Sequence, residues 1–474
     1  MRTGLMALGL VVAMLGGADA ASAFLSANTI DDLATHKKRG KLVVVTGPIR
    51  CTRGERVSIS VVVRQPATAA RARNRWKGRC TGELQHWQVR ARTRRGTRFE
   101  NGTGRVCAVA NTRIRSRVTD TRRWCERVNV SASQSRSHSK STADEVCFTV
   151  KNTGDHIPST VHGTLFRVKK RSHLRSTALL LQHGAVAERS AWSGGAPIIK
   201  GTHDTARSLA KRGYAVFAID RLGYGDSPYE RPPGSGSLLT PDGYVEMTHQ
   251  MVTQIRTGSY TDCAGKPAGR GATRVVLSGF SSGAAIVEGY ATRHHDIDGI
   301  IPMFWSNQPQ LSEAFQELIG VLVPQLAARQ DYVEFFLDGT DGYSEFCERF
   351  LFYVPGMRAK ALGQLCGPDY YAQTAWPTPS GEGGNLNLPA ETIGNVGPTP
   401  VLLVFGDRDA AFPGPDNHAA DPDLVTPEIA MWRNGCNCEV SVYIQRNAGH
   451  VGLFHRTSKS VTKRILDWLD HRDL

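Results

Sequence analysis

The N-terminal part of the chain alternates polar and apolar residues with a period of two. Residues 57–63 are almost all β-branched, and arginine occupies every second position of 90–94 and 113–117. This period is typical of strands with one face toward a core and the other toward solvent. Because Gly-rich turns separate the runs and no helical stripe interrupts them, the sequence predicts a small all-β domain, a β-sandwich, over residues 24–130.

The rest of the chain alternates strand-like apolar runs with helical stretches. Six apolar runs have the length of buried strands: 178–181, 215–219, 275–277, 299–303, 401–405 and 440–444. This strand-helix-strand order predicts an α/β domain over residues 145–474, with a mostly parallel sheet flanked by helices. In such sheets the functional site lies in the loops that leave the carboxyl ends of the strands.

A polar segment separates the two predicted domains. Residues 131–144 are rich in Ser and contain Arg, His, Lys and Thr, with little that could form a core. The segment is therefore predicted to be a linker. The length of 474 residues leaves room for both domains.

The first 23 residues have the features of a secretory signal peptide. Arg2 precedes an apolar run over 5–15, and small residues suited to signal peptidase follow at 18–23. A membrane anchor is the alternative, but it needs about 20 apolar residues. We therefore expect cleavage, no transmembrane segment in the mature chain, and a secreted or extracytoplasmic protein.

The net charge of +15 is unevenly distributed along the chain. Residues 24–175 hold 33 Lys and Arg against 10 Asp and Glu, whereas residues 176–474 hold 24 against 32. Such a basic domain could bind an acidic cell-surface polymer, or its arginines could form a solvated face. Aromatic residues are few and do not lie on the arginine faces, so no nucleic-acid partner is expected.

Ten cysteines fit an oxidising compartment better than a metal site, because no CxxC spacing occurs. The sequence cannot fix their pairing. A nested arrangement, Cys51 with Cys125 and Cys80 with Cys107, is compatible with paired strands. Each half holds five cysteines, so either free thiols remain or a bridge joins the halves, for which Cys147 is the best candidate.

A serine lies between glycines where a predicted strand meets a predicted helix. The sequence Gly279-Phe-Ser281-Ser-Gly283 follows the run 275–277 directly. Small flanking residues permit a sharp turn that exposes the serine hydroxyl above the sheet. Ser281 is therefore the predicted nucleophile, and the neighbouring Ser282 lacks the glycine spacing.

A second loop could supply hydrogen-bond donors beside this serine. Gln182-His-Gly184 follows the strand 178–181, and a glycine there lets the next amide, that of Ala185, point toward Ser281. With the amide of Ser282 it would form an oxyanion hole.

Two further loops offer a base and a carboxylate. Asp407 and Asp409 end the run 401–405, and His450 follows the run 440–444. A serine hydroxyl needs a base, and an imidazole base needs a carboxylate to orient it. We predict His450 as the base rather than His455, and Asp409 as its carboxylate because it lies past the strand end.

These motifs resemble those of the α/β-hydrolase superfamily, especially its secreted bacterial serine esterases and lipase-like members, over residues 145–474. The matching segments are 182–184, 218–227, 279–283, 406–409 and 449–450. The resemblance implies Ser281, His450 and Asp409 as the triad and the amides of Ala185 and Ser282 as the oxyanion hole. Phe280 departs from the pattern, because many relatives carry His there. The N-terminal domain resembles no established family.

The resemblance also implies that an insertion at residues 304–395 forms a lid over the pocket, although a surface decoration is the alternative. Cys347 and Cys366 could link it internally. The predicted function is a secreted serine hydrolase that cleaves carboxylic esters through an acyl-enzyme, with no metal or organic cofactor. The alternatives are a peptidase or thioesterase of the same fold, or an inactive protein that binds a polyanion or surface.

Overall fold

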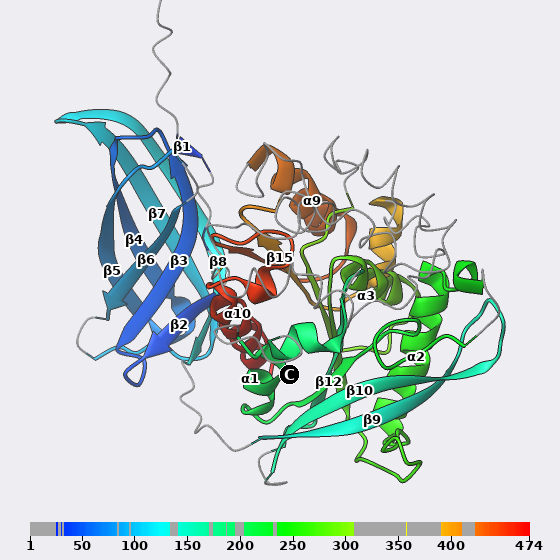
Figure 1. The fold of residues 1–474 in the computed structure, drawn as a ribbon. Coiled ribbons are helices and arrows are strands. Elements are labelled where there is room, and N and C mark those ends of the chain that lie inside the picture. The colour runs from blue at the N-terminus through cyan, green and yellow to red at the C-terminus, as the bar shows by residue number, and fades with distance from the viewer. Residues whose placement is uncertain are drawn as a thin grey trace, which may run out of the picture.

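The computed structural model describes most of the chain as two bodies (Figure 1). The described residues are 25–26, 30, 33–82, 85–93, 96–132, 141–169, 174–185, 187–194, 203–230, 235–307, 357, 390–409 and 422–474. The predicted signal peptide, Cys347, Cys366 and most of the predicted lid lie outside them. No helix among these residues is long and apolar enough to cross a membrane.

The first body is an all-β domain of eight strands. They are β1 (Leu25–Ser26), β2 (Leu33–Lys37), β3 (Leu42–Cys51), β4 (Arg56–Gln65), β5 (Ala70–Arg79), β6 (Gln85–Arg92), β7 (Gly102–Ile114) and β8 (Arg117–Ala132). They pair in the order β1-β3-β2-β8-β7-β4-β5, and β6 also pairs with β3. A bridge between Ala72 and Thr93 joins β5 to the end of β6. The predicted two-sheet sandwich is therefore wrong, because one sheet curls round to form a barrel.

The barrel core comes from the period-two pattern that predicted its strands. Val57, Ile59, Val61 and Val63 of β4 are all at most 2% exposed, and residues between them face outward. The inward residues of all the long strands, together with Trp87, form one apolar cluster. This burial turns the arginines of the same strands to the outer face of the barrel.

Strand register decides the disulfides of the barrel. Cys107 and Cys125 lie directly opposite each other on β7 and β8 and are bonded, and Cys51 at the end of β3 is bonded to Cys80. The predicted nested pairing is therefore wrong. The strands also extend into the predicted linker, since β8 ends at Ala132 and β9 begins at Ser141.

The second body contains the predicted mostly parallel sheet. Its strands are β9 (Ser141–Lys151), β10 (Pro158–Val168), β11 (Thr177–Gln182), β12 (Ala215–Ile219), β13 (Arg274–Phe280), β14 (Gly299–Met303), β15 (Val401–Gly406) and β16 (Val440–Gln445). The order is β16-β15-β14-β13-β11-β12-β10-β9. All neighbours from β12 to β16 are parallel, and β9 and β10 add an antiparallel edge. The six predicted strand positions are confirmed.

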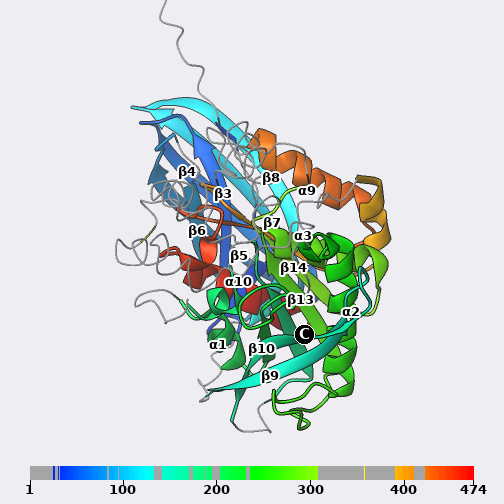
Figure 2. The ribbon, with the colours of Figure 1, turned by 45° about the vertical axis from the view of Figure 1, so that its right-hand side comes forward.

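Helices cover both faces of this sheet, as Figure 2 shows. They are α1 (Thr205–Ala210), α2 (Pro241–Thr257), α3 (Ser282–Arg293), α9 (Pro422–Gly435) and α10 (Ser458–His471), with short 3-10 turns η1 (Pro66–Thr68), η3 (Arg189–Ser193), η4 (Ser235–Leu238), η8 (Ala390–Val396) and η9 (Gly452–Phe454). One apolar cluster joins α1 and α10 to the sheet, and a second joins α2, α3 and α9 to its other face. Buried on both faces, the central strands are apolar throughout. Helix α10 also contacts β8 of the barrel.

Two more disulfides lie in the described part of the second body. Cys147 of β9 is bonded to Cys263, and Cys436 is bonded to Cys438. The predicted bond from Cys147 to the second half of the chain is confirmed, although both partners belong to the same domain. Among the described residues no cysteine is free, which is consistent with an extracytoplasmic location.

Candidate active site

Ser281 occupies a strained turn between β13 and α3. Its backbone angles are φ 53° and ψ −132°, a combination that non-glycine residues rarely adopt. A Cβ atom at Gly279 would lie 2.1 Å from the carbonyl oxygen of Gly283, and one at Gly283 would lie 2.4 Å from the carbonyl oxygen of His183. Both flanking glycines are therefore required by close backbone contact, as the sequence pattern indicates.

The structure brings Ser281, His450 and Asp409 together from three separate loops. The Ser281 hydroxyl lies 2.8 Å from His450 Nε2, and His450 Nδ1 lies 3.1 Å from Asp409 Oδ2. The side chains of His450 and Asp409 are each only 3% exposed. Because the carboxylate can only accept, Nδ1 carries a proton in this arrangement, and Nε2 is left to accept the proton of the serine.

The loop after β11 packs directly against this serine. A Cβ atom at Gly184 would lie 2.7 Å from the Cβ atom of Ser281. Ala185 follows this glycine, and Ser282 is the first residue of α3, where backbone N–H groups have no partner within the helix. The two predicted amide donors thus belong to the two segments that meet at Ser281.

The turn before Ala185 is held by a buried histidine. His183 Nδ1 donates to the carbonyl of Gly184 at 2.7 Å, and its Nε2 accepts the backbone N–H of Arg221 at 3.0 Å. Burial, reinforced by the positive charge of Arg221, holds the pKa of His183 well below its usual value. The ring is therefore neutral and can make both bonds.

A comparison with known families finds a match to part of the second body. Residues 191–342 match the sequence profile of the family described as serine aminopeptidase, S33. The second body has the α/β-hydrolase fold, and we call it the α/β-hydrolase domain. The match includes Ser281 and ends before Asp409 and His450.

Solved structures similar to this chain include several enzymes. A bromoperoxidase from Bacillus anthracis is 16% identical, with a TM-score of 0.44, over 68% of this chain and 99% of its own. An epoxide hydrolase from Vigna radiata is 13% identical, with a TM-score of 0.42, over 69% and 98%. An esterase from Pyrococcus furiosus is 13% identical, with a TM-score of 0.38, over 70% and 92%. No curated protein matches the sequence significantly.

Asp407 and His455 are the alternatives to Asp409 and His450 in the sequence analysis. In the structure both bond to the backbone of the loop that carries His450. Asp407 accepts the backbone N–H of Ala448 at 3.2 Å, and burial raises the pKa of Asp407 to about 6. His455 accepts the N–H of Gly449 at 3.0 Å, and burial lowers the pKa of His455 to about 4. Both side chains therefore fix the backbone just before His450.

Arg221 is a site residue that the sequence analysis did not single out. Its guanidinium is buried, lies 4.6 and 4.9 Å from the ring centres of Tyr224 and Tyr244, and donates to the Ser282 hydroxyl at 3.1 Å. The positive charge of Arg221 therefore lies within hydrogen-bond distance of Ser282, the residue that follows Ser281. The sequence places Arg221 in a loop that matches the family, but nothing in the pattern shows that the side chain turns inward.

Asp220 and Arg189 hold the adjoining loop. Asp220 is 1% exposed, forms an ion pair with Arg189, and also accepts the backbone N–H groups of Arg189 and Asp226 at 2.7 and 3.0 Å. A side chain at Gly225 would strike this carboxylate, since its Cβ would lie 2.5 Å away. The network anchors η3 just beyond the Gly184 turn.

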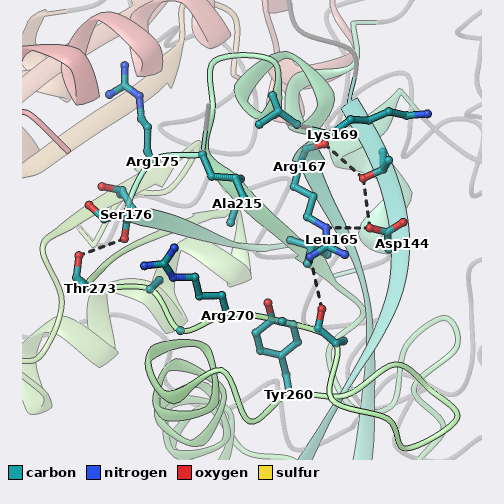
Figure 3. Close-up of a pocket in the computed structure, with 18 of the residues that line it drawn as sticks. Asp144, Leu165, Arg167, Lys169, Arg175, Ser176, Ala215, Tyr260, Arg270 and Thr273 are labelled. Atoms are coloured by element: carbon teal, nitrogen blue, oxygen red, sulfur yellow. Dashed lines mark hydrogen bonds and ion pairs between the residues drawn. The ribbon is translucent and has the colours of Figure 1, made fainter. Parts of the chain in front are cut away.

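A large cavity in the described structure lies away from Ser281. It measures about 1020 Å³ and is lined by the amino ends of β11, β12 and β13, including Thr177, Ala215 and Thr273 (Figure 3). Ser281 follows the carboxyl end of the seven-residue β13, which spans roughly 20 Å. The cavity therefore does not contain the candidate site.

One group among the described residues has spacing suited to a metal ion, formed by Cys147, His162 and Cys263. The two sulfur atoms are joined in a disulfide, so they provide no thiolate ligands.

Proposed function

We propose that the protein is a serine hydrolase that cleaves carboxylic esters through an acyl-enzyme. The observation that carries the proposal is the hydrogen-bonded chain from Ser281 through His450 to Asp409. This arrangement supplies a nucleophile, a base and a carboxylate that orients the base. None of these steps requires a metal or an organic cofactor.

In the proposed acylation step, the Ser281 oxygen attacks the ester carbonyl carbon while His450 Nε2 takes the hydroxyl proton. Asp409 stabilises the resulting imidazolium, and the amides of Ala185 and Ser282 donate to the oxyanion. Collapse of the tetrahedral intermediate breaks the bond to the alcohol oxygen, which receives the proton from His450. Water then repeats the sequence against the acyl-enzyme and releases the acid.

A peptidase of the same fold is the second candidate, because the matched family is described as serine aminopeptidase. The same groups would then protonate an amine leaving group. A panel of nitrophenyl esters, thioesters and aminoacyl nitroanilides discriminates among these substrates by their kcat/KM values.

The catalytic assignment is tested with a short-chain nitrophenyl ester and a fluorophosphonate probe. Replacement of Ser281 by Ala should abolish labelling and lower kcat by at least about 10³-fold. Ser259→Ala is the matched control, because Ser259 is an exposed serine after α2, and it should behave as wild type. An inert wild-type protein, or an active Ser281→Ala variant, would refute the proposal.

We also propose that residues 1–23 are a signal peptide and that the mature enzyme is exported. The four disulfides among the described residues support this location. Intact-mass analysis of protein from a culture supernatant should show a chain shortened by about 20 residues. Retention of the full-length chain in the cytosol with reduced cysteines would refute export.

A further inference from the structure

The outer face of the barrel carries arginines in a row that crosses four strands. Arg71 of β5 lies opposite Arg64 of β4, Arg64 lies opposite Arg105 of β7, and Arg105 lies opposite Arg127 of β8. All four are exposed. Since adjacent strands are about 4.8 Å apart, this row places four guanidinium groups along about 14 Å.

A second row repeats the arrangement at the other end of the same strands. Arg79 of β5 lies opposite Arg56 of β4, which lies opposite Arg113 of β7. Exposed basic residues at every second position of β5 connect the two rows: Arg73, Arg75 and Lys77. A notch of about 380 Å³ beside the second row is lined by Gly54, Arg56, Lys77, Gly78 and Arg79.

Nothing in the described part of the barrel neutralises these rows. No acidic side chain there forms an ion pair with either row, and Asp120 pairs instead with Arg122, which belongs to neither row. Like charges placed directly opposite on neighbouring strands destabilise a sheet. Arginine keeps its charge at all ordinary pH values. The rows therefore weaken the isolated fold, and their arrangement is explained by a ligand that supplies the missing negative charge.

We infer that this face binds an anionic polysaccharide. The guanidinium group forms paired hydrogen bonds with carboxylate, sulfate or phosphate groups. The two rows are eight residues apart along β5, about 27 Å, so a small anion can reach only one of them. An extended polymer with repeating charges can contact both rows and the β5 residues between them.

The structure favours a polysaccharide over a nucleic acid. The two tryptophans on these strands, Trp76 and Trp124, pack against the barrel core. The described part of the arginine face thus offers no aromatic ring for a base to stack on. A lipid membrane is also disfavoured, because in the described part of the barrel no large apolar side chain is exposed between the two rows; Ile114 and Val118 lie at the tip of the β7–β8 hairpin.

This site is independent of the chemistry at Ser281. Six of the seven row arginines lie on β4, β5 and β7, and β4 and β5 are on the side of the barrel away from the α/β-hydrolase domain (Figure 1). Arg127 lies on β8, the strand that α10 contacts, and its side chain is exposed. Polymer binding would hold the enzyme on a surface without occupying the candidate active site.

The test measures binding of the full chain to heparin and to polygalacturonate as a function of salt. If the polymer occupies the seven arginines of the two rows, the affinity should fall about 10³-fold between about 50 and 200 mM NaCl. A variant with Arg64, Arg71, Arg105 and Arg127 all changed to Gln should bind at least about 50-fold more weakly at low salt, with a salt slope shallower by about 3. Its melting temperature should equal or exceed that of wild type, because repulsion is removed.

The matched control removes four exposed positive charges from the other domain: Lys266→Gln, Arg270→Gln, Arg456→Gln and Lys459→Gln. It should bind within about twofold of wild type. An equal loss in the control would show that net charge alone is responsible and would overturn the inference. So would tighter binding of single-stranded oligo(dT) or of anionic phosphatidylglycerol vesicles at the same salt, or an absence of polysaccharide binding by wild type.

Discussion

Two carboxylates at the end of β15 allow the roles proposed in the site to be separated. Asp409 Oδ2 lies 3.1 Å from His450 Nδ1, whereas Asp407 contacts the backbone of Ala448. Replacing each by Asn keeps its size and removes its charge. Only the change at position 409 should remove the group that stabilises a protonated His450.

The size of the effect follows from the distance. Two unit charges 3.1 Å apart interact by about 5 kcal/mol at an effective dielectric constant of about 20. Since about 1.4 kcal/mol corresponds to a tenfold change in rate, Asp409→Asn should lower kcat by about 10⁴-fold. An Asn at 409 that presents its NH₂ group would also favour a His450 tautomer that cannot accept the serine proton.

Asp407→Asn is the matched control. The new amide retains an oxygen that can accept the Ala448 N–H, so kcat should fall less than about tenfold. The assay is hydrolysis of a nitrophenyl ester under saturating conditions, with circular dichroism to confirm folding. A larger loss from Asp407→Asn than from Asp409→Asn would refute the assignment of Asp409.

Three further perturbations test other features. Gly184→Ala places a Cβ atom 2.7 Å from that of Ser281, so kcat for ester hydrolysis should fall at least about tenfold. An unchanged kcat would contradict the close contact between residue 184 and Ser281. Burial and the nearby Glu428 hold the pKa of Glu288 well above its usual value, so the native state keeps a proton that the unfolded chain releases. Stability should therefore fall as pH rises above about 4.5, by up to about 1.4 kcal/mol per pH unit. Glu288→Gln should flatten this dependence in urea unfolding, and a slope parallel to wild type would exclude Glu288 as its source. Changing Cys107 and Cys125 to Ser removes a disulfide between residues 18 positions apart. Calorimetry should show that the barrel is destabilised by about 3 kcal/mol. A loss of ester hydrolysis in the folded variant would contradict independence of the two domains.

The sheet of the α/β-hydrolase domain could be predicted from the sequence because its central strands are buried on both faces. Such strands are continuous apolar runs, and every run from 178–181 to 440–444 lies within an observed strand. The turn at Ser281 could also be predicted from the sequence, because close backbone contacts require glycine at 279 and 283. In both cases the constraint is local.

Features that depend on distant contacts could not be predicted. The disulfide between Cys107 and Cys125 follows from the register of β7 on β8, and closure of the barrel depends on a bridge from Ala72 to Thr93. The inward turn of Arg221 likewise depends on two tyrosines that it meets only in the folded chain. A linear pattern records which residues are apolar, but it does not record which strands become neighbours.

The facing arginines of β4, β5 and β7 also make the stability of the barrel depend on its surroundings. Dissolved ions screen repulsion between exposed charges, with a screening length of about 10 Å at 0.1 M salt. The barrel is therefore least stable in dilute buffer and gains stability as ions accumulate around it. Residues 176–474 instead hold 24 Lys and Arg against 32 Asp and Glu, so low ionic strength should separate the unfolding of the two domains into distinct steps.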